Sequence, residues 1–162
     1  MTESIARPLR TKQRIVLVGS MGVYSQLLDY ARKLNSHGIQ TIVPEPEDEA
    51  TQQFSLFEFE DFKRRVSFAH LRKIRDPRTY GILAVNLDRH GILNYVGPNT
   101  FAEIAVAFAQ SKKIYLLQNT PEAYSDELTA WRATPLFGQI DRLISDFRTD
   151  CMGDDPQLDF FD

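Results

Sequence analysis

The chain has 162 residues, a formal net charge of −3 and a hydrophobic fraction of 43%. This length suits one domain with a substantial core, and no run of about 18 apolar residues is present that could span a membrane. The negative charge argues against direct binding to nucleic acid. The single cysteine, Cys151, excludes an intrachain disulfide. With the missing apolar signal segment, it predicts a cytoplasmic protein. We interpret Cys151 as a surface thiol.

The first part of the chain predicts a strand, a helix and a second strand. Residues 1–13 are polar and predict a flexible N-terminal arm. The run Arg14 to Val18 is typical of a buried parallel strand. Leucine and alanine follow at helical spacing over residues 23–36, and residues 39–43 predict the next strand. A strand, helix and strand in this order form the unit of a parallel sheet.

The alternation continues after a polar loop at 45–53. The further predicted elements are a mixed helix at 54–74, a strand at 80–86, a loop at 87–98, a helix at 100–111, a strand at 114–117, short helices at 124–131 and 140–147, and an extended piece near 136–137. The mixed helix carries a basic cluster, which is either a solvated face or a surface for a phosphate or a partner. Its members are Lys63, Arg64, Arg65, Arg72, Lys73 and Arg75.

This order of elements predicts an α/β fold of the doubly wound, Rossmann- or flavodoxin-like class. We expect a mostly parallel sheet of four to five strands with helices on both faces, in a single domain over 14–149. An acidic tail is expected at 150–162. Such sheets bind ligands at the carboxyl ends of their strands. That rule directs attention to the turns after Val18, Val43, Val85 and Leu117.

The turn after the first strand, Gly19-Ser20-Met21-Gly22, is the first candidate site. Small residues let a ligand approach the backbone, and the following helix directs its N–H groups at any anion. The turn lacks the spacing of a dinucleotide fingerprint and has no Walker-type lysine. A tight turn without a ligand explains it almost as well.

The second candidate is the segment from Asn94 to Glu103, which leads into an alanine-rich helix. Asn99 or Thr100 would cap that helix, and Glu103 would complete a capping box with Thr100. Alternatively, Glu103 faces a cleft as a nucleophile or general base. From the residues alone, both interpretations of Glu103 stand equal. The residues expected to bind substrate are Gly19, Ser20, Asn86, Asp88, Asn94, Tyr95, Gly97, Asn99 and Thr100.

The three histidines, His37, His70 and His90, predict no metal site. They share no metal-ligand spacing, and no cysteine joins them. His90 is a further site candidate because its loop lies near the second candidate segment. We expect neither a metal nor another cofactor.

The run from Ala84 to Leu117 resembles the nucleoside 2-deoxyribosyltransferase superfamily, which includes deoxynucleoside monophosphate N-glycosidases. The matching residues are Gly97, Asn99, Thr100, Glu103 and Ala107, followed by Lys113 to Leu117. The opening run Ile15 to Gly19, with Ser20, is similar to the family's first strand and turn. One departure is Gly97, which stands where the family often has an aspartate, six residues before Glu103. Asp88 is a candidate for the missing acid.

The resemblance implies cleavage or transfer at an N-glycosidic bond of nucleosides or nucleotides. Glu103 would attack the anomeric carbon of a 2-deoxyribosyl group, as the nucleophile does in retaining glycosidases. Tyr95, Asn99 or the turn at Ser20 would orient Glu103 and the sugar hydroxyls. The resemblance also implies a homo-oligomer, and exposed aromatic residues of the 54–68 helix could supply its interface. A non-catalytic nucleotide-binding or sensing module is the alternative.

The last residues suggest a third function, that of an interaction protein. Gln157-Leu158-Asp159-Phe160-Phe161 resembles the short peptide by which bacterial proteins dock on the DNA-polymerase sliding clamp, with Phe160 in place of leucine. A solvated tail can offer such apolar anchors to a groove on its partner. The competing interpretation is that Phe160 and Phe161 fold back on their own domain or on a neighbouring subunit.

Overall fold

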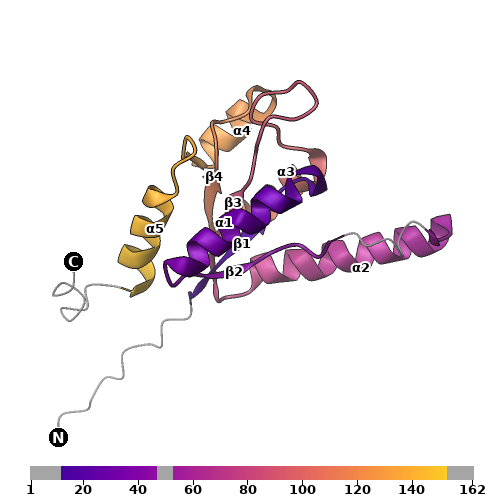
Figure 1. The fold of residues 1–162 in the computed structure, drawn as a ribbon, viewed down its shortest axis with the longest axis horizontal. Coiled ribbons are helices and arrows are strands. Elements are labelled where there is room, and N and C mark those ends of the chain that lie inside the picture. The colour runs from indigo at the N-terminus through magenta and orange to yellow at the C-terminus, as the bar shows by residue number, and fades with distance from the viewer. Residues whose placement is uncertain (1–11, 47–52, 153–162) are drawn as a thin grey trace, which may run out of the picture.

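The protein is built on a five-stranded, entirely parallel sheet (Figure 1). The structure, a computed structural model, describes residues 12–46 and 53–152. The strands are β1 (Arg14–Val18), β2 (Gln40–Ile42), β3 (Thr79–Ala84), β4 (Lys113–Leu116) and β5 (Thr134–Pro135). Their order, β2-β1-β3-β4-β5, is the flavodoxin-like order of a doubly wound sheet. The predicted fold class is confirmed.

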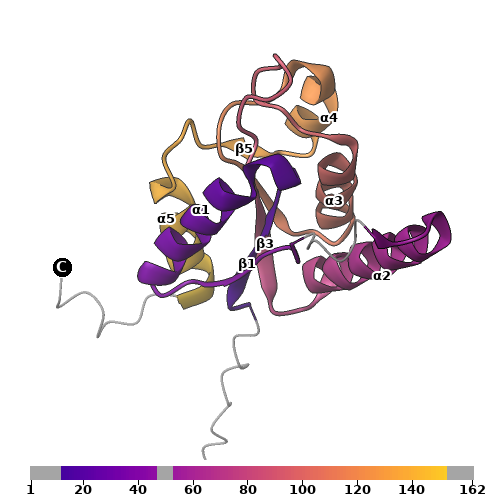
Figure 2. The same ribbon diagram turned by 45° about the vertical axis from the view of Figure 1, so that its right-hand side comes forward.

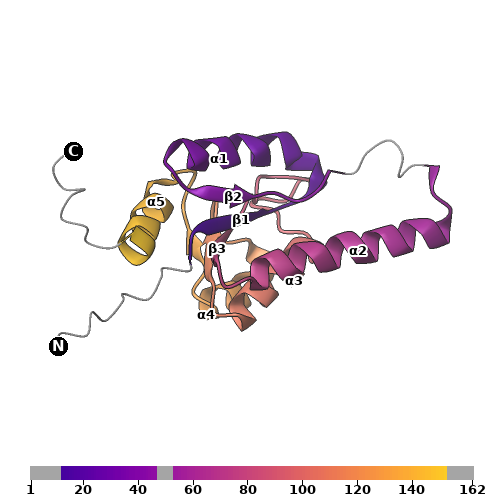
Figure 3. The ribbon, with the colours of Figure 1, turned by 90° about the horizontal axis from the view of Figure 1, so that it is seen from below.

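Helices cover both faces of this sheet. They are α1 (Tyr24–Ser36), α2 (Leu56–Arg75), α3 (Pro98–Ala109), α4 (Ser125–Ala130) and α5 (Asp141–Phe147). α1 and α5 lie on one face, whereas α2, α3 and α4 lie on the other (Figures 2 and 3). None of the described helices is long and apolar enough to cross a membrane.

The two-sided core explains the unbroken apolar run of β1. Ile15 and Leu17 pack into the core on the α1 and α5 side, and Val16 and Val18 pack into the core on the opposite side. Successive side chains of a strand point to opposite faces, so a strand covered on both faces needs apolar residues throughout. All five residues of β1 are buried.

The last strand lies two residues earlier than the extended piece predicted near 136–137. β5 is an edge strand at Thr134–Pro135, and such a position tolerates proline because the missing N–H faces away from the sheet. The Leu136 N–H still donates to the Leu116 carbonyl oxygen at 2.8 Å. Phe137 and Gly138 then adopt φ values of 52° and 80°, and the Gly138 N–H donates to the Leu117 carbonyl oxygen, just after β4, at 2.7 Å.

The end of the described chain is held against the sheet. A π-helix at Arg148–Met152 follows α5, so residues 150–152 of the predicted tail are helical. The Tyr80 hydroxyl donates to Asp150 at 2.6 Å, and the Tyr115 hydroxyl donates to Asp146 at 2.8 Å. Burial raises the pKa of both tyrosines, which therefore stay protonated donors. The interpretation of Cys151 as a surface thiol is wrong, because its side chain packs into the core.

Both predicted terminal segments fall largely outside the described residues. The N-terminal arm is described only from residue 12 onward. The clamp-like residues Gln157, Leu158, Phe160 and Phe161 lie wholly outside the described ranges.

A stack of aromatic rings joins α3 to the region of α4. Phe101 stacks on Tyr124 with ring centroids 4.2 Å apart. The Trp131 ring lies 5.5 Å from Phe101 and 4.9 Å from Phe108, nearly parallel to both. Phe101 and Phe108 are both residues of α3, so Trp131 packs along this helix.

Candidate functional site

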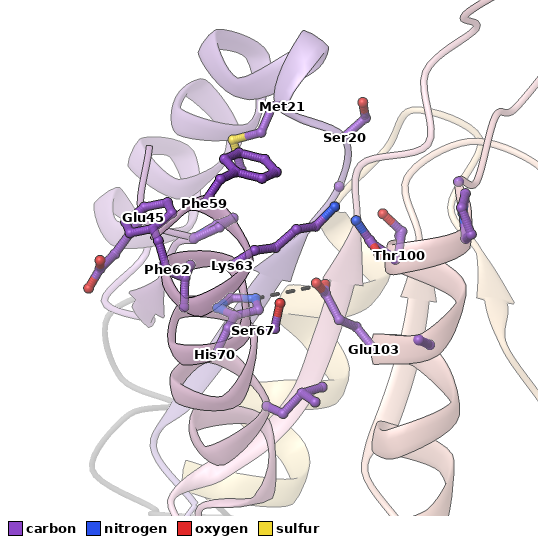
Figure 4. Close-up of a pocket in the computed structure, with 18 of the residues that line it drawn as sticks. Ser20, Met21, Glu45, Phe59, Phe62, Lys63, Ser67, His70, Thr100 and Glu103 are labelled. Atoms are coloured by element: carbon purple, nitrogen blue, oxygen red, sulfur yellow. Dashed lines mark ion pairs between the residues drawn. The ribbon is translucent and has the colours of Figure 1, made fainter. Parts of the chain in front are cut away.

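A cavity of about 420 Å³ lies between α2 and α3, beside the carboxyl end of β1 (Figure 4). This is the point where the strand order reverses, because β1 has β2 on one side and β3 on the other. Open α/β sheets bind ligands at this place. The volume falls within the roughly 300–1,000 Å³ typical of small-molecule sites.

One face of α2 forms a wall of the cavity. The helix begins after Ser55, whose hydroxyl oxygen accepts a hydrogen bond from the Glu58 N–H at 3.2 Å. The lining residues recur every three or four positions, as expected for one face of a helix. They are Phe59, Phe62, Lys63, Val66, Ser67, His70 and Leu71. This wall therefore combines aromatic rings with polar groups.

Lys63 is the member of the predicted basic cluster that lines the cavity. Its side chain extends toward the start of α3 near Thr100 (Figure 4). Arg65 instead pairs with Asp61 on the exposed surface of α2, at 3.0 Å. The basic cluster thus divides between the cavity and a solvated helix face.

The opposite wall is the first part of α3. This helix begins at Pro98 with Gly97 as its N-cap, and no side chain caps it. Proline suits the first position, because its φ is already helical and no N–H is lost. The prediction that Asn99 or Thr100 caps the helix is therefore wrong, and no capping box forms with Glu103. Asn99, Thr100 and Glu103 instead line the cavity.

The Glu103 carboxyl is a largely buried acid in the cavity wall. Its side chain is 22% exposed, and burial raises its pKa from 4.5 to about 7. Burial has this effect because the ionised form loses hydration. Near neutral pH the group therefore exists in both protonation states. Carboxyl groups tuned in this way serve as nucleophiles or as general acids and bases.

His70 faces Glu103 from α2, with its Nε2 atom 3.8 Å from Oε2 of the carboxyl (Figure 4). Burial, with a smaller contribution from Lys73, lowers the pKa of His70 from 6.5 to about 4. The imidazole is therefore neutral at pH 7, and its contact with Glu103 is no salt bridge there. The Leu17 backbone lies close enough to raise the pKa of the ring slightly, but neither ring nitrogen makes a hydrogen bond of normal geometry among the described residues. Sequence reasoning did not select His70, although its helical spacing from Phe59, Phe62 and Ser67 could have.

The turn after β1 supplies a third side of the cavity through Gly19 and Ser20. The Ser20 hydroxyl oxygen accepts hydrogen bonds from the Gly22 N–H at 3.4 Å and from the Arg89 guanidinium. Arg89, which the sequence did not single out, thereby links this turn to the loop after β3. Pro44 and Glu45, which follow β2, also line the cavity.

The amides and acid predicted near the end of β3 support the loop and do not line the cavity. Asn86 is buried, and its side chain donates to the Asn119 carbonyl and accepts from the Gln118 N–H, both at 2.8 Å. Asp88 accepts from the Asn94 N–H at 2.8 Å, and the Asn94 side-chain oxygen accepts from the Asn119 N–H at 3.3 Å. These bonds connect the ends of β3 and β4 to the loop that carries Tyr95.

Tyr95 and Gly97 bring the end of that loop to the cavity wall. A Cβ atom at position 97 would lie 3.2 Å from the Tyr95 hydroxyl oxygen, which is tighter than an ordinary contact. Glycine therefore lets the tyrosine pack closely on the start of α3. His90 contacts the same tyrosine edge to face, with ring centroids 5.2 Å apart, but does not line the cavity.

Metal-ligating side chains are not grouped within the described ranges. No three His, Cys, Asp or Glu residues there lie close enough together to hold a metal ion. The cavity thus combines the Glu103 carboxyl with the neutral His70 imidazole. The rings of Phe59 and Phe62, which come from the same helix as His70, also line it.

The chain has a distant structural similarity to a protein of known structure. No family model and no curated protein matches the chain. Among solved structures, the chain is similar to the CMP N-glycosidase BcmB of Clostridium botulinum, with 18% sequence identity and a TM-score of 0.48. The alignment covers 83% of this chain and 96% of that one.

Proposed function

We propose that this protein cleaves the N-glycosidic bond of a nucleoside or nucleotide, or transfers its sugar to a second base, with Glu103 as the nucleophile. The observation that carries the proposal is the buried Glu103 carboxyl in a cavity at the switch point of the sheet. The family resemblance of the segment around Glu103 supports the same reaction. Phe59 and Phe62 offer the flat apolar surface on which a nucleobase stacks.

The chemistry follows from the position of the carboxyl. The ionised oxygen of Glu103 attacks the anomeric carbon as the bond to the base breaks, and the base leaves with the electron pair and takes a proton from water. Positive charge develops on the sugar in this step, and a nearby carboxylate stabilises it. Water or a second base then attacks the glycosyl-enzyme ester and releases Glu103.

The raised pKa of Glu103 is compatible with this role. Burial raises the pKa of Glu103 to about 7, so protonated and ionised carboxyl groups are both present near neutral pH. A sugar that gains positive charge beside the carboxyl favours its ionised form. The carboxylate is therefore stabilised more in the transition state than in the free protein, as transition-state stabilisation requires.

Base release from a panel of nucleosides and nucleoside 5′-monophosphates tests the proposal. We expect release of free base by the native protein and a loss of at least about a thousandfold in Glu103→Gln. Glu127→Gln, on the exposed surface of α4, is the matched control and should retain the activity. Nucleotide binding without release by the folded native protein would contradict the proposal and favour the non-catalytic module.

We infer further that two copies of the chain associate through the beginning of α2. Leu56 and Phe57 are 76% and 79% exposed there, which is unusual for neighbouring large apolar side chains. This half of α2 extends beyond the sheet (Figure 3), and the next turn of the helix carries the cavity residue Phe59. An interface at this place would lie directly beside the site.

A further inference from the structure

His70 presents an unsatisfied polar group to the cavity. Its side chain is only 7% exposed, and neither ring nitrogen makes a hydrogen bond of normal geometry within the described part of the chain, although the Leu17 backbone lies close enough to raise the pKa of the ring. A buried polar atom without a partner costs about 1–3 kcal/mol. Such a cost is offset when a bound molecule supplies the missing hydrogen bond, so the ring is placed to bind a polar group of the ligand.

A hydroxyl oxygen beside the contact between His70 and Glu103 can reach both groups at once. The 3.8 Å between Nε2 and Oε2 is too long for a direct hydrogen bond. One oxygen atom at the usual hydrogen-bond distance of about 2.8 Å can contact both atoms at once. A hydroxyl can accept from the N–H of a neutral imidazole and donate to a carboxylate, so it satisfies both groups.

The stereochemistry of the proposed reaction identifies that hydroxyl. The nucleophile attacks the anomeric carbon on the face opposite to the departing base. In a β-ribonucleoside the 2′-hydroxyl lies on this same face, on the carbon next to the one attacked. The 3′-hydroxyl lies on that face too, but one carbon farther from the attacked atom. The 2′-hydroxyl is therefore the hydroxyl nearest to the attacking carboxyl oxygen, and a 2′-deoxy sugar has only the bare C2′ there.

We propose that His70 binds the 2′-hydroxyl of the sugar and makes the site select ribosyl over 2-deoxyribosyl substrates. This inference rests on the proposed function and extends it to the class of sugar. A 2′-deoxy substrate leaves the buried imidazole unpaired, and sites built to hydrogen-bond a hydroxyl discriminate strongly against analogues that lack it. The assignment reverses the 2-deoxyribosyl preference that the family resemblance implies.

Matched pairs of ribo- and 2′-deoxyribonucleotides test the selectivity through base release. We expect kcat/KM of the native protein to favour the ribo member by about tenfold or more. His70→Leu should bring this ratio close to one by slowing the ribo substrate, and His70→Asn, which keeps a hydrogen-bonding side chain, should retain part of it. His37→Asn is the matched control, because His37 is exposed at the end of α1. Equal kcat/KM values for the two sugars would overturn the assignment.

A second measurement needs no turnover. Ribose and 2-deoxyribose, each free and as its 5-phosphate, are titrated into the ¹⁵N-labelled native protein while the imidazole nitrogen resonances are followed. We expect ribose compounds to shift the His70 resonance, which is assigned by its loss in His70→Asn, and the 2-deoxy compounds to leave it in place. No shift, or the same shift with both sugars, contradicts the assignment.

The two measurements separate the two proposals. A ribose-selective shift of His70 without base release from any nucleotide would remove the glycosidic reaction and keep the binding role of His70. Base release that depends on Glu103 but ignores the 2′-hydroxyl would keep the reaction and remove the role of His70.

Discussion

Glu103 and His70 couple the protonation of the cavity to the stability of the fold in opposite directions. The pKa of Glu103 is raised to about 7, so its contribution to stability is fully present below its unfolded value of 4.5 and is lost as the pH rises through 7. The pKa of His70 is lowered to about 4. Its contribution is present above the unfolded value of 6.5 and is lost as the pH falls through 4.

The variant Glu103→Gln should therefore be more stable than the native protein at pH 8. A pKa raised from 4.5 to about 7 sets an upper bound of about 3 kcal/mol on this gain. The gain should shrink as the pH is lowered toward 4.5, because Glu103 of the native protein then becomes protonated in the unfolded state as well as in the folded state. Urea unfolding at a series of pH values measures the difference.

Glu127→Gln provides the comparison for this series. Glu127 is exposed on α4, so its replacement should change the free energy of unfolding little at any pH. A stability difference for Glu103→Gln that stayed constant between pH 5 and pH 8 would show that the carboxyl titrates normally in the folded state.

Among the elements, the loop between β3 and α3 depends on one buried amide. Asn86→Ala removes hydrogen bonds to Gln118 and Asn119 and leaves these partly buried backbone groups without these partners. We expect a loss of about 2 kcal/mol in the free energy of unfolding. Faster proteolysis of the loop around Ile92 and Leu93 should accompany it. The exposed Gln139→Ala, between β5 and α5, should cost about 0.5 kcal/mol or less.

The elements that sequence analysis predicted well are those whose local pattern and tertiary role agree. After their first residues, Arg14 and Thr79, β1 and β3 are apolar because helices cover both of their faces, and this is visible in the residues themselves. The start of α3 differs because two local signals compete. Asn99 and Thr100 are good caps, but Pro98 fits the first helical turn and places the cap at Gly97.

The sides of the site that follow the carboxyl ends of strands were predictable, and Gly19 and Ser20 after β1 line the cavity as expected. Gly97 to Glu103 form one segment at the carboxyl end of the sheet, so the fold rule selected them. His70 belongs to the same cavity but comes from α2, and only the packing of α2 against α3 brings it within 3.8 Å of Glu103. Asn86 is the opposite case, since its location suggests a ligand but its amide is taken up by neighbouring backbone.

At the scale of the whole molecule, the exposed start of α2 predicts self-association. We expect the described fold to form at least a dimer at micromolar concentration, and the double variant Leu56→Ser with Phe57→Ser to shift it toward the monomer. The reason is that the apolar area of these side chains, 76% and 79% exposed, is removed from water in the interface. Sedimentation velocity measures the distribution of species.

Leu93→Ser is the matched control for that experiment. Leu93 is also a large apolar residue, 70% exposed, but it lies in the loop after β3. Its replacement should leave the distribution of species unchanged. A native protein that remains monomeric over the whole concentration range would contradict association through α2.

The aromatic stack beside α3 gives the molecule an optical property. Trp131 is the single tryptophan of the chain, and its indole lies against Phe101 and Phe108, on the helix that carries Glu103. Its emission therefore comes from one defined environment and responds to any shift of this helix. We expect a ligand that shifts α3 to change this emission, so the unlabelled protein carries its own fluorophore for a binding titration.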